Sequence, residues 1–229
     1  MKNINEETRT VVISTLDDRA RERMRRIEKH LELAGFRNVE IFQARTPQGE
    51  DFQGRGLPPV LKGRWKSDLQ HMWGTAACAL SHLDLMKLDP SELPIIVFED
   101  DAIISPHFFS YLADIDFPDE VEWDICHLSY FNENLGSAKY PEGVVNKNLL
   151  RCAPNEITCM HSYILNQPVF DRVTPLHEEI DCQLAHQTDL IRSFVIEHGP
   201  PLTSPDFELQ SVRMELDEIY WAKNNPNHN

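Results

Sequence analysis

Cysteine is scarce in this sequence, and its five copies form no CxxC pair. An odd number at irregular spacings argues against a disulfide framework and against a cysteine-rich zinc site. We therefore expect free thiols in a reducing environment, that of the cytosol. The five are Cys78, Cys126, Cys152, Cys159 and Cys182.

Long apolar runs are also missing. The opening residues, MKNINEETRT, are polar and contain no apolar stretch of the kind that a signal peptide has. No apolar run approaches the ~20 residues that span a bilayer. The sequence therefore predicts a cytoplasmic protein without a transmembrane segment.

Positive charge is in short supply. The chain has 22 Lys and Arg against 37 Asp and Glu, which gives a net charge of −15. Such a chain repels the phosphates of a nucleic acid, so no nucleic-acid partner is expected. It would repel a nucleotide pyrophosphate in the same way. An anionic substrate therefore requires a cation or a local arginine cluster to bridge the mismatch.

The sequence lacks internal repeats and low-complexity segments, and its 229 residues fit one α/β domain spanning 1–229. Short β-branched runs alternate with helical periodicity, which is typical of a mainly parallel sheet covered by helices. We predict strands at 10–14, 39–42, 94–98, 123–128, 162–165 and 193–196, and helices at 17–34, 75–87 and 106–112. Residues 45–71 are predicted to be an active-site loop, 131–149 an insertion, and the segment after about 217 a frayed polar tail.

What the sequence does contain is an acidic triplet, Glu99-Asp100-Asp101, directly after the apolar run 95–98. In open α/β sheets, ligands bind beyond the carboxyl ends of the strands, where this triplet falls. Adjacent acids repel one another, and a hard divalent cation would relieve that repulsion. If the backbone stays extended, Glu99 and Asp101 project to one side and Asp100 to the other. The alternative is a solvated strand end in which one Asp caps a helix.

The exit of the first strand is a second candidate site. Ser14, Thr15 and Leu16 lead into a helix that carries Arg19 and Arg23 one turn apart. Backbone N–H groups at a helix start, with arginine nearby, suit a nucleotide's base, ribose or phosphates. The alternative is that Asp17 caps the helix and both arginines lie on a solvated face.

A third feature is the small-residue segment 74–82, which predicts a helix packed closely on the sheet. Ser81 and His82 would place polar groups a turn or two inside it. A single histidine on a helix is usually a hydrogen-bonded structural residue, and that alternative stays open here.

Taken in order, these segments resemble glycosyltransferase family 25, which includes lipooligosaccharide and collagen galactosyltransferases. The family's G-x-x-G-C-x-x-S-H block followed by its E-D-D strand end is the most specific part. Four features depart from the family or match it weakly: the first motif lacks its usual Asn, Gln43 to Thr46 are a weak match, His161 replaces a small residue, and 45–71 and 131–149 match nothing. The matching segments are 14–23, 74–83, 98–102, 122–125, 161–165 and 179–181.

The resemblance implies a single GT-A, Rossmann-like domain and a metal-dependent transfer from a nucleotide-sugar donor, such as UDP-galactose, to a glycan or protein hydroxyl. Mn²⁺ or Mg²⁺ would bind the donor diphosphate. Asp101 would be the direct ligand, Glu99 would reach the ribose or the metal, and Asp100 would touch the donor sugar. The residues implied to bind the donor are Ser14, Thr15, Leu16, Arg19, Ser81, His82, Glu99 and Asp100.

The resemblance also implies an inverting reaction, which needs one general base. Asp181, in the late matched segment, is the leading candidate, although an acid at this place could simply cap a helix. His82 or Asp124 could serve instead, and His161 and His198 are candidate third metal ligands.

Two other classes stay open. A glycosyltransferase-like protein could bind a nucleotide sugar without turnover. A metal-dependent phosphohydrolase also places aspartates at a strand end, but Asp101 is followed by Ala102-Ile103-Ile104 instead of that class's pattern. The donor sugar, acceptor, linkage and oligomeric state do not follow from the sequence.

Overall fold

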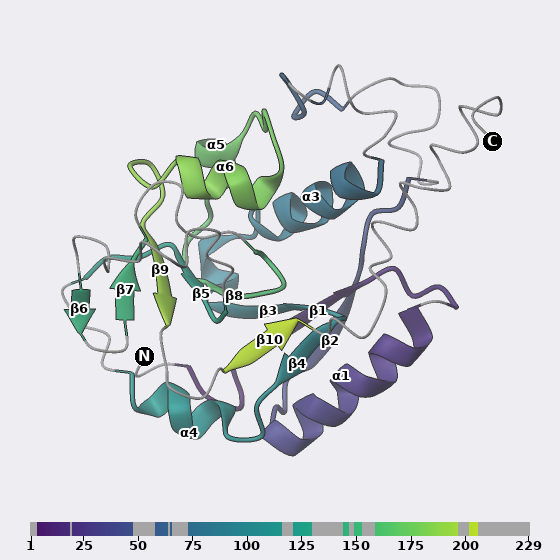
Figure 1. Cartoon of the computed structure of the whole chain (residues 1–229), viewed down its shortest axis with the longest axis vertical. Coiled ribbons are helices and arrows are strands. Elements are labelled where there is room, and N and C mark those ends of the chain that lie inside the picture. Colours follow the sequence, from purple (N-terminus) through teal and green to yellow (C-terminus); the bar gives the residue numbers. More distant parts are fainter. Residues whose placement is uncertain are drawn as a thin grey trace, which may run out of the picture.

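The computed structural model describes residues 4–18, 20–47, 58–63, 65, 73–115, 121–129, 144–146, 149–152, 159–196 and 202–205. Its centre is an eight-stranded sheet within these residues (Figure 1). The strands are β1 (Thr10–Ser14), β2 (Val39–Gln43), β3 (Ile95–Glu99), β5 (Ile125–His127), β6 (Val144–Asn146), β7 (Leu149–Arg151), β8 (Ser162–Leu165) and β9 (Ser193–Ile196). They lie in the order β2-β1-β3-β8-β5-β9-β7-β6.

The sheet is mainly parallel in strand direction. Strand β1 pairs in parallel with β2 and β3, and β5 pairs in parallel with β9. Strand β8 runs antiparallel to β3 and β5, and β7 runs antiparallel to β9 and β6. Six of the eight strands described in this sheet therefore point one way, and β7 and β8 point the other way. The predicted α/β class and all six predicted strands are confirmed.

Helices cover both faces of the sheet (Figure 1). Helices α1 (Ala20–Ala34) and α4 (Phe108–Ala113) lie on one face, and α3 (Trp73–Leu85), α5 (Phe170–Val173) and α6 (Ile180–His186) lie on the other. A 3-10 turn, η2, spans Pro90–Glu92. The strand side chains alternate between two apolar cores: Val11 and Val97 pack with α3, whereas Val12 and Phe98 pack with α1.

Helix α1 ends at the predicted residue, Ala34, but begins at Ala20, three residues after the predicted start at 17. The Asp17 carboxylate accepts the Ala20 N–H at 2.9 Å, so the capping alternative for this aspartate is realised. The helix ends at Gly35 with φ of 87°, in a conformation that glycine adopts without strain. Bonds from the Gly35 and Phe36 N–H groups to the carbonyls of Glu32 and Leu31 complete a Schellman motif. The three side chains predicted to be buried are buried: Met24, Ile27 and Leu31.

Three predicted irregular segments fall largely or wholly outside the described residues. Of the predicted loop 45–71, the structure describes 45–47, 58–63 and 65, and the tail after 217 is not described. Within the predicted insertion 131–149, strand β6 and the start of β7 are present. Strands of three residues carry too little periodicity to be recognised in sequence. A small antiparallel pair, β4 (Ala102–Ile104) with β10 (Thr203–Pro205), lies beside the main sheet.

One edge of the sheet collects polar side chains. Because β1 and β3 are parallel, their carboxyl ends meet at this edge, and the amino end of antiparallel β8 joins them. The Glu99 N–H donates to the His161 carbonyl at 2.8 Å, and the Asp100 N–H donates to the Ile13 carbonyl at 3.1 Å. The acidic triplet therefore stands at the carboxyl edge, as predicted. None of the helices that the structure describes combines the length and apolar character that crossing a membrane requires.

Candidate functional site

The acidic triplet divides because β3 ends at Glu99. Glu99 continues the alternation of Ile95 and Val97 and faces α3, whereas Asp100 faces α1. Asp100 and Asp101 form a turn before β4. The extended arrangement that would place Glu99 and Asp101 on one side therefore stops at Glu99.

Glu99 is held by helix α3. One of its oxygens, Oε1, accepts hydrogen bonds from His82 Nε2 at 2.9 Å and from Cys78 Sγ at 3.3 Å. Burial raises the pKa of Glu99, but the hydrogen bond and charge of His82, with smaller contributions from His161 and Cys78, lower it to about 2. Glu99 is therefore an ionised, oriented acceptor at neutral pH.

A fully buried tyrosine fixes His82 in turn. The other ring nitrogen, Nδ1, lies 3.0 Å from the Tyr163 hydroxyl, and neither side chain is exposed. With both nitrogens engaged, the ring has one orientation. His82 therefore acts on Glu99 in this structure, and the hydrogen-bonded structural role considered from sequence is present.

Asp100 is held by the opposite face. The Ser14 hydroxyl donates to Oδ2 at 2.6 Å, and Arg23 Nε forms an ion pair with Oδ1 at 2.9 Å. Burial raises the pKa of Asp100 to about 6, against the opposing effects of Arg23 and Ser14. Arg23 is 5% exposed, so the solvated-face alternative does not hold for this arginine.

Asp101 is the member of the triplet whose charge is least compensated, although the positive charge of Arg23 partly lowers its pKa. Its Oδ1 is buried and has no hydrogen-bond partner among the described residues. Burial, together with the negative charges of Glu99 and Asp100, raises the pKa of Asp101 to about 7. A carboxylate oxygen in this position fits a hard divalent cation such as Mn²⁺ or Mg²⁺, which prefers oxygen ligands. Glu99 is the other acid of the triplet that could complete such a site, because both oxygens of Asp100 are already engaged by Ser14 and Arg23.

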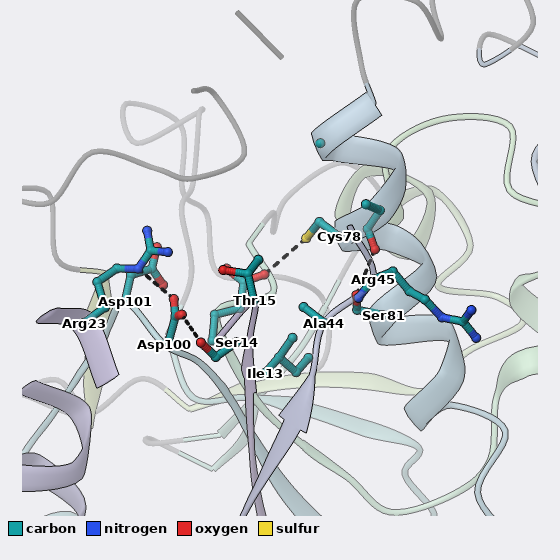
Figure 2. A pocket seen from close by; sticks show the side chains of 13 residues that line it. Ile13, Ser14, Thr15, Arg23, Ala44, Arg45, Cys78, Ser81, Asp100 and Asp101 are labelled. Carbon is teal, nitrogen blue, oxygen red and sulfur yellow. Dashed lines mark hydrogen bonds and ion pairs between the residues drawn. The ribbon is translucent and has the colours of Figure 1, made fainter. Parts of the chain in front are cut away.

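A cavity of about 90 Å³ separates the β1 exit from α3 and reaches all three acids (Figure 2). Thr15 and Ser81 line it from opposite sides, together with Cys78 and Arg45. The Thr15 hydroxyl oxygen is buried and, within the described part of the chain, has no hydrogen-bond partner. Complete ligand sites usually occupy ~300–1,000 Å³. This cavity can therefore hold only the part of a ligand that touches the acids.

The remaining residues predicted to bind the donor have mixed positions. Ser81 lies on the cavity wall, accepts the Arg45 N–H at 2.8 Å and donates to the Ala77 carbonyl. Leu16 does not line the cavity, is 51% exposed and has φ of 57°, a left-handed conformation that costs a leucine ~1 kcal/mol or more. Arg19 lies outside the described residues.

Asp181, predicted as the base, lies in the first turn of α6. Its Oδ1 accepts the N–H of Cys182 at 3.0 Å, and the carboxylate is half-buried. Burial raises the pKa of the Cys159 thiol to about 12, and the charges of Glu99, Asp181 and Asp101 add to that effect. Asp181 therefore belongs to the same electrostatic neighbourhood as the triplet.

The alternative base Asp124 is remote from this edge. It precedes β5, whose direction matches β3, so it lies at the opposite edge of the sheet. It is fully buried and accepts hydrogen bonds from Arg172 at 2.7 Å and from the Arg192 side chain and backbone. Asp124 ties three segments together and does not reach the cavity.

Of the two histidines considered as third ligands, the structure describes His161. His161 is buried, with Nδ1 bonded to Cys159 Sγ and Nε2 bonded to Ser129 Oγ. Burial lowers the pKa of His161 to about 4. In this structure His161 is held by Cys159 and Ser129 and does not join the cluster of Cys78, His82 and Glu99. His198 lies outside the described residues.

Sequence reasoning did not assign roles to Cys78 or Tyr163, and it expected Arg23 beside a nucleotide or on a solvated face, not paired with Asp100. A signal existed for Cys78, because it lies four residues before His82 and therefore on the same helix face. The contacts of Arg23 and Tyr163 join residues far apart in the sequence, at Asp100 and His82.

Comparison with known proteins shows the family of this chain. The model of glycosyltransferase family 25 (LPS biosynthesis protein) matches residues 9–184, and the chain belongs to this family. It is a glycosyltransferase. It is similar to a solved glycosyltransferase involved in the glycosylation of the major capsid of PBCV-1, with a TM-score of 0.48 and 13% identity over 93% of this chain and 98% of that chain. A comparison with curated protein sequences gave no significant match.

Proposed function

We propose that this glycosyltransferase is metal-dependent and moves a hexose from a UDP-galactose-like donor to a hydroxyl of a glycan or protein. The observation that carries the proposal is the buried, unpartnered Asp101 oxygen beside a cavity at the carboxyl edge of the sheet. The proposal includes one GT-A domain over residues 1–229, a cytoplasmic location and a role in lipopolysaccharide biosynthesis, in keeping with the family's description.

Charge explains why a cation belongs in the scheme. The chain carries −15, and a nucleotide diphosphate is also anionic, so direct contact between the donor and the triplet is repulsive. When bound, Mn²⁺ or Mg²⁺ supplies the positive charge that stabilises the departing diphosphate. Asp101 and Glu99 are the residues that would hold it, because Asp100 already uses both oxygens on Ser14 and Arg23.

The chain's own residues orient the donor. His82 holds Glu99 in the orientation for accepting a ribose hydroxyl or a metal-bound water. The Thr15 hydroxyl, unpartnered among the described residues, can donate to the nucleotide. Asp100 stiffens the floor of the cavity through Arg23, and this use of its two oxygens argues against the sugar contact that the resemblance implied.

The proposed reaction is a single inverting displacement. The acceptor hydroxyl attacks the anomeric carbon, the bond to the diphosphate breaks, and the hydroxyl proton passes to a base. Asp181 is the proposed base. Asp124 is not the proposed base, because it lies at the opposite edge of the sheet. There Arg172 and Arg192 bind its carboxylate, an arrangement that we call the Asp124 clasp.

A product assay with UDP-sugars and Mn²⁺ tests the proposal. Transfer supports it, donor binding without turnover supports the binding-protein alternative, and release of free phosphate supports the phosphohydrolase.

We expect Asp101→Asn to lower transfer by about 100-fold or more, because a metal ion contributes several kcal/mol to such a transition state. The matched control is Asp114→Asn at the exposed end of α4, which should leave transfer unchanged. Wild-type activity of Asp101→Asn at limiting Mn²⁺ would refute the assignment.

A further inference from the structure

Helix α3 and strand β3 bring together three different metal-ligating atoms. The Cys78 Sγ, His82 Nε2 and Glu99 oxygen all lie within 4.8 Å of one another. Cys78 and His82 are one helical turn apart and share a face, so their spacing is fixed by the helix. Glu99 is fixed by the strand and already accepts a hydrogen bond from each of the other two.

We propose that Cys78, His82 and Glu99 bind a late divalent transition metal, Zn²⁺, at a centre distinct from the oxygen site at Asp101. Thiolate, imidazole and carboxylate are the ligands that Zn²⁺ takes in proteins, whereas Mn²⁺ and Mg²⁺ favour oxygen. The odd, irregular cysteines exclude a cysteine-rich zinc site but not a mixed one assembled from a helix and a strand.

The surroundings of His82 fit this role. A ligating histidine usually has its second nitrogen held by a hydrogen-bond partner, and Tyr163 provides that partner at 3.0 Å from Nδ1. In the metal-bound form the ring proton resides on Nδ1 and is donated to the tyrosine oxygen, which leaves Nε2 free to bind the metal. Both side chains are fully buried, so this arrangement is rigid.

The charges also balance. Binding releases to solvent the Cys78 thiol proton and the Nε2 proton that His82 donates to Glu99, and the resulting thiolate together with the Glu99 carboxylate neutralises the two positive charges of the ion. A neutral centre avoids the cost of burying net charge. Three protein ligands leave a fourth position for water or substrate, and Cys78 and Glu99 both line the cavity from which it would come.

Sharing Glu99 couples this centre to transfer. If Glu99 serves the donor as proposed above, Zn²⁺ at the trio removes it from that task, so Zn²⁺ inhibits transfer at saturating Mn²⁺. This consequence rests on the proposed function. The binding of the metal itself does not.

Cobalt(II) provides the direct test, because it substitutes for Zn²⁺ and is coloured. We expect the metal-free full chain to bind one equivalent of Co²⁺ with a near-ultraviolet thiolate-to-cobalt band and the intense visible bands of a four-coordinate ion. Added Zn²⁺ should abolish both. Cys78→Ser should lose the thiolate band and lower Zn²⁺ affinity at least 10-fold in competition with a chromophoric chelator. The matched control, Cys182→Ser at another partly exposed thiol, should behave as wild type.

A chain that shows no thiolate band, or a Cys78→Ser variant that keeps it, would overturn the proposal. Melting temperatures establish that each variant is folded, and Cys78→Ala provides a second substitution at the same position. The spectra are recorded without donor, so they stand whether or not transfer is detected. Failure of the proposed function would show in the product assay alone. Relief of Zn²⁺ inhibition in Cys78→Ser would support the coupling through Glu99, and undiminished inhibition would contradict it.

Discussion

Glu99, Asp100 and Asp101 are sequence neighbours in three different electrostatic environments. Against the effect of burial, hydrogen bonding from His82 lowers the pKa of Glu99 to about 2. Burial raises the pKa of Asp100 to about 6, although Arg23 opposes it, and raises that of Asp101 to about 7 with help from the other two acids. A raised pKa means that the charged form is disfavoured in the folded chain. The folded chain therefore gains most from a cation at Asp101.

A single substitution at Asp181 tests whether this residue is the general base. If it is the base, Asp181→Asn should lower kcat by about 10²–10⁴-fold while donor affinity stays unchanged. Its Oδ1 accepts the Cys182 N–H, and asparagine keeps that oxygen, so stability should change little. Kinetics, donor Kd and melting temperature are measured on the variant and on the exposed control Asp189→Asn.

Near-normal turnover in Asp181→Asn, together with a stability loss of ~1 kcal/mol in Asp181→Ala, would instead identify Asp181 as a helix-capping residue. A loss of donor affinity as large as the loss of kcat would contradict both roles and place Asp181 among the donor ligands.

At the scale of elements, two helices on opposite faces of the sheet deliver polar side chains to the end of β3. Helix α1 delivers Arg23 to Asp100, and α3 delivers His82 to Glu99. Strand alternation assigns the two acids to opposite faces, so one helix cannot serve both. The tip of β3 is therefore braced from both sides before any ligand binds.

The ion pair between Arg23 of α1 and Asp100 should contribute measurably to the free energy of unfolding. Arg23→Gln leaves the buried Asp100 without its counter-ion, and we expect a loss of about 3 kcal/mol, as for other broken buried pairs. Urea unfolding at pH 7.5 measures it. In a double-mutant cycle, Asp100→Asn should recover much of the loss, because it removes the uncompensated charge. Additive effects of the two substitutions would contradict the pairing.

The elements could be predicted from sequence better than their contacts. The runs at 11–13 and 95–98 are apolar throughout because both faces of those strands are covered, and the spacing of Met24, Ile27 and Leu31 specifies a helix face. The acids after β3 were placed at the correct edge by the rule for α/β sheets.

The remaining features depend on distant partners. Asp124 meets Arg172 and Arg192 from 48 and 68 residues away, so its local sequence indicates only a strand start. The antiparallel direction of β8, which places His161 beside the acids, likewise has no local signature. Arg23 can be buried because it forms an ion pair with Asp100, which lies far away in the sequence.

At the scale of the whole molecule, the chain holds a net charge of −15 together with an acid that has a buried oxygen at each edge of its sheet. At one edge Asp124 is neutralised by two arginines that come from α5 and from the segment preceding β9. At the other edge Asp101 has no such partner among the described residues. The first arrangement stabilises the fold, and the second is suited to binding a cation.

The Asp124 clasp predicts a pH dependence of stability. Burial raises the pKa of Asp124, but hydrogen bonds from Arg172 and Arg192 outweigh it and lower the pKa from 3.8 to about 2. A depressed pKa contributes stability above the unfolded value, and that stability is lost as pH falls through about 2. We expect Asp124→Asn to lose about 2 kcal/mol at pH 7 and much less at pH 2. Unfolding free energies of the variant, wild type and Asp114→Asn across this range provide the measurement, and parallel curves would contradict the clasp.

The most direct test of the central claim is the melting temperature of the wild-type chain and of Asp101→Asn with a UDP-hexose at about 100 times its Kd, in the presence of Mn²⁺ or of a chelator. Binding to the folded state alone should raise the wild-type melting temperature by about 5–10 °C with Mn²⁺ and hardly at all with the chelator. Asp101→Asn should show no donor-dependent rise in either condition. An equal rise with the chelator, or a full rise in Asp101→Asn, would contradict a cation held by Asp101 as the link between this acidic chain and its donor.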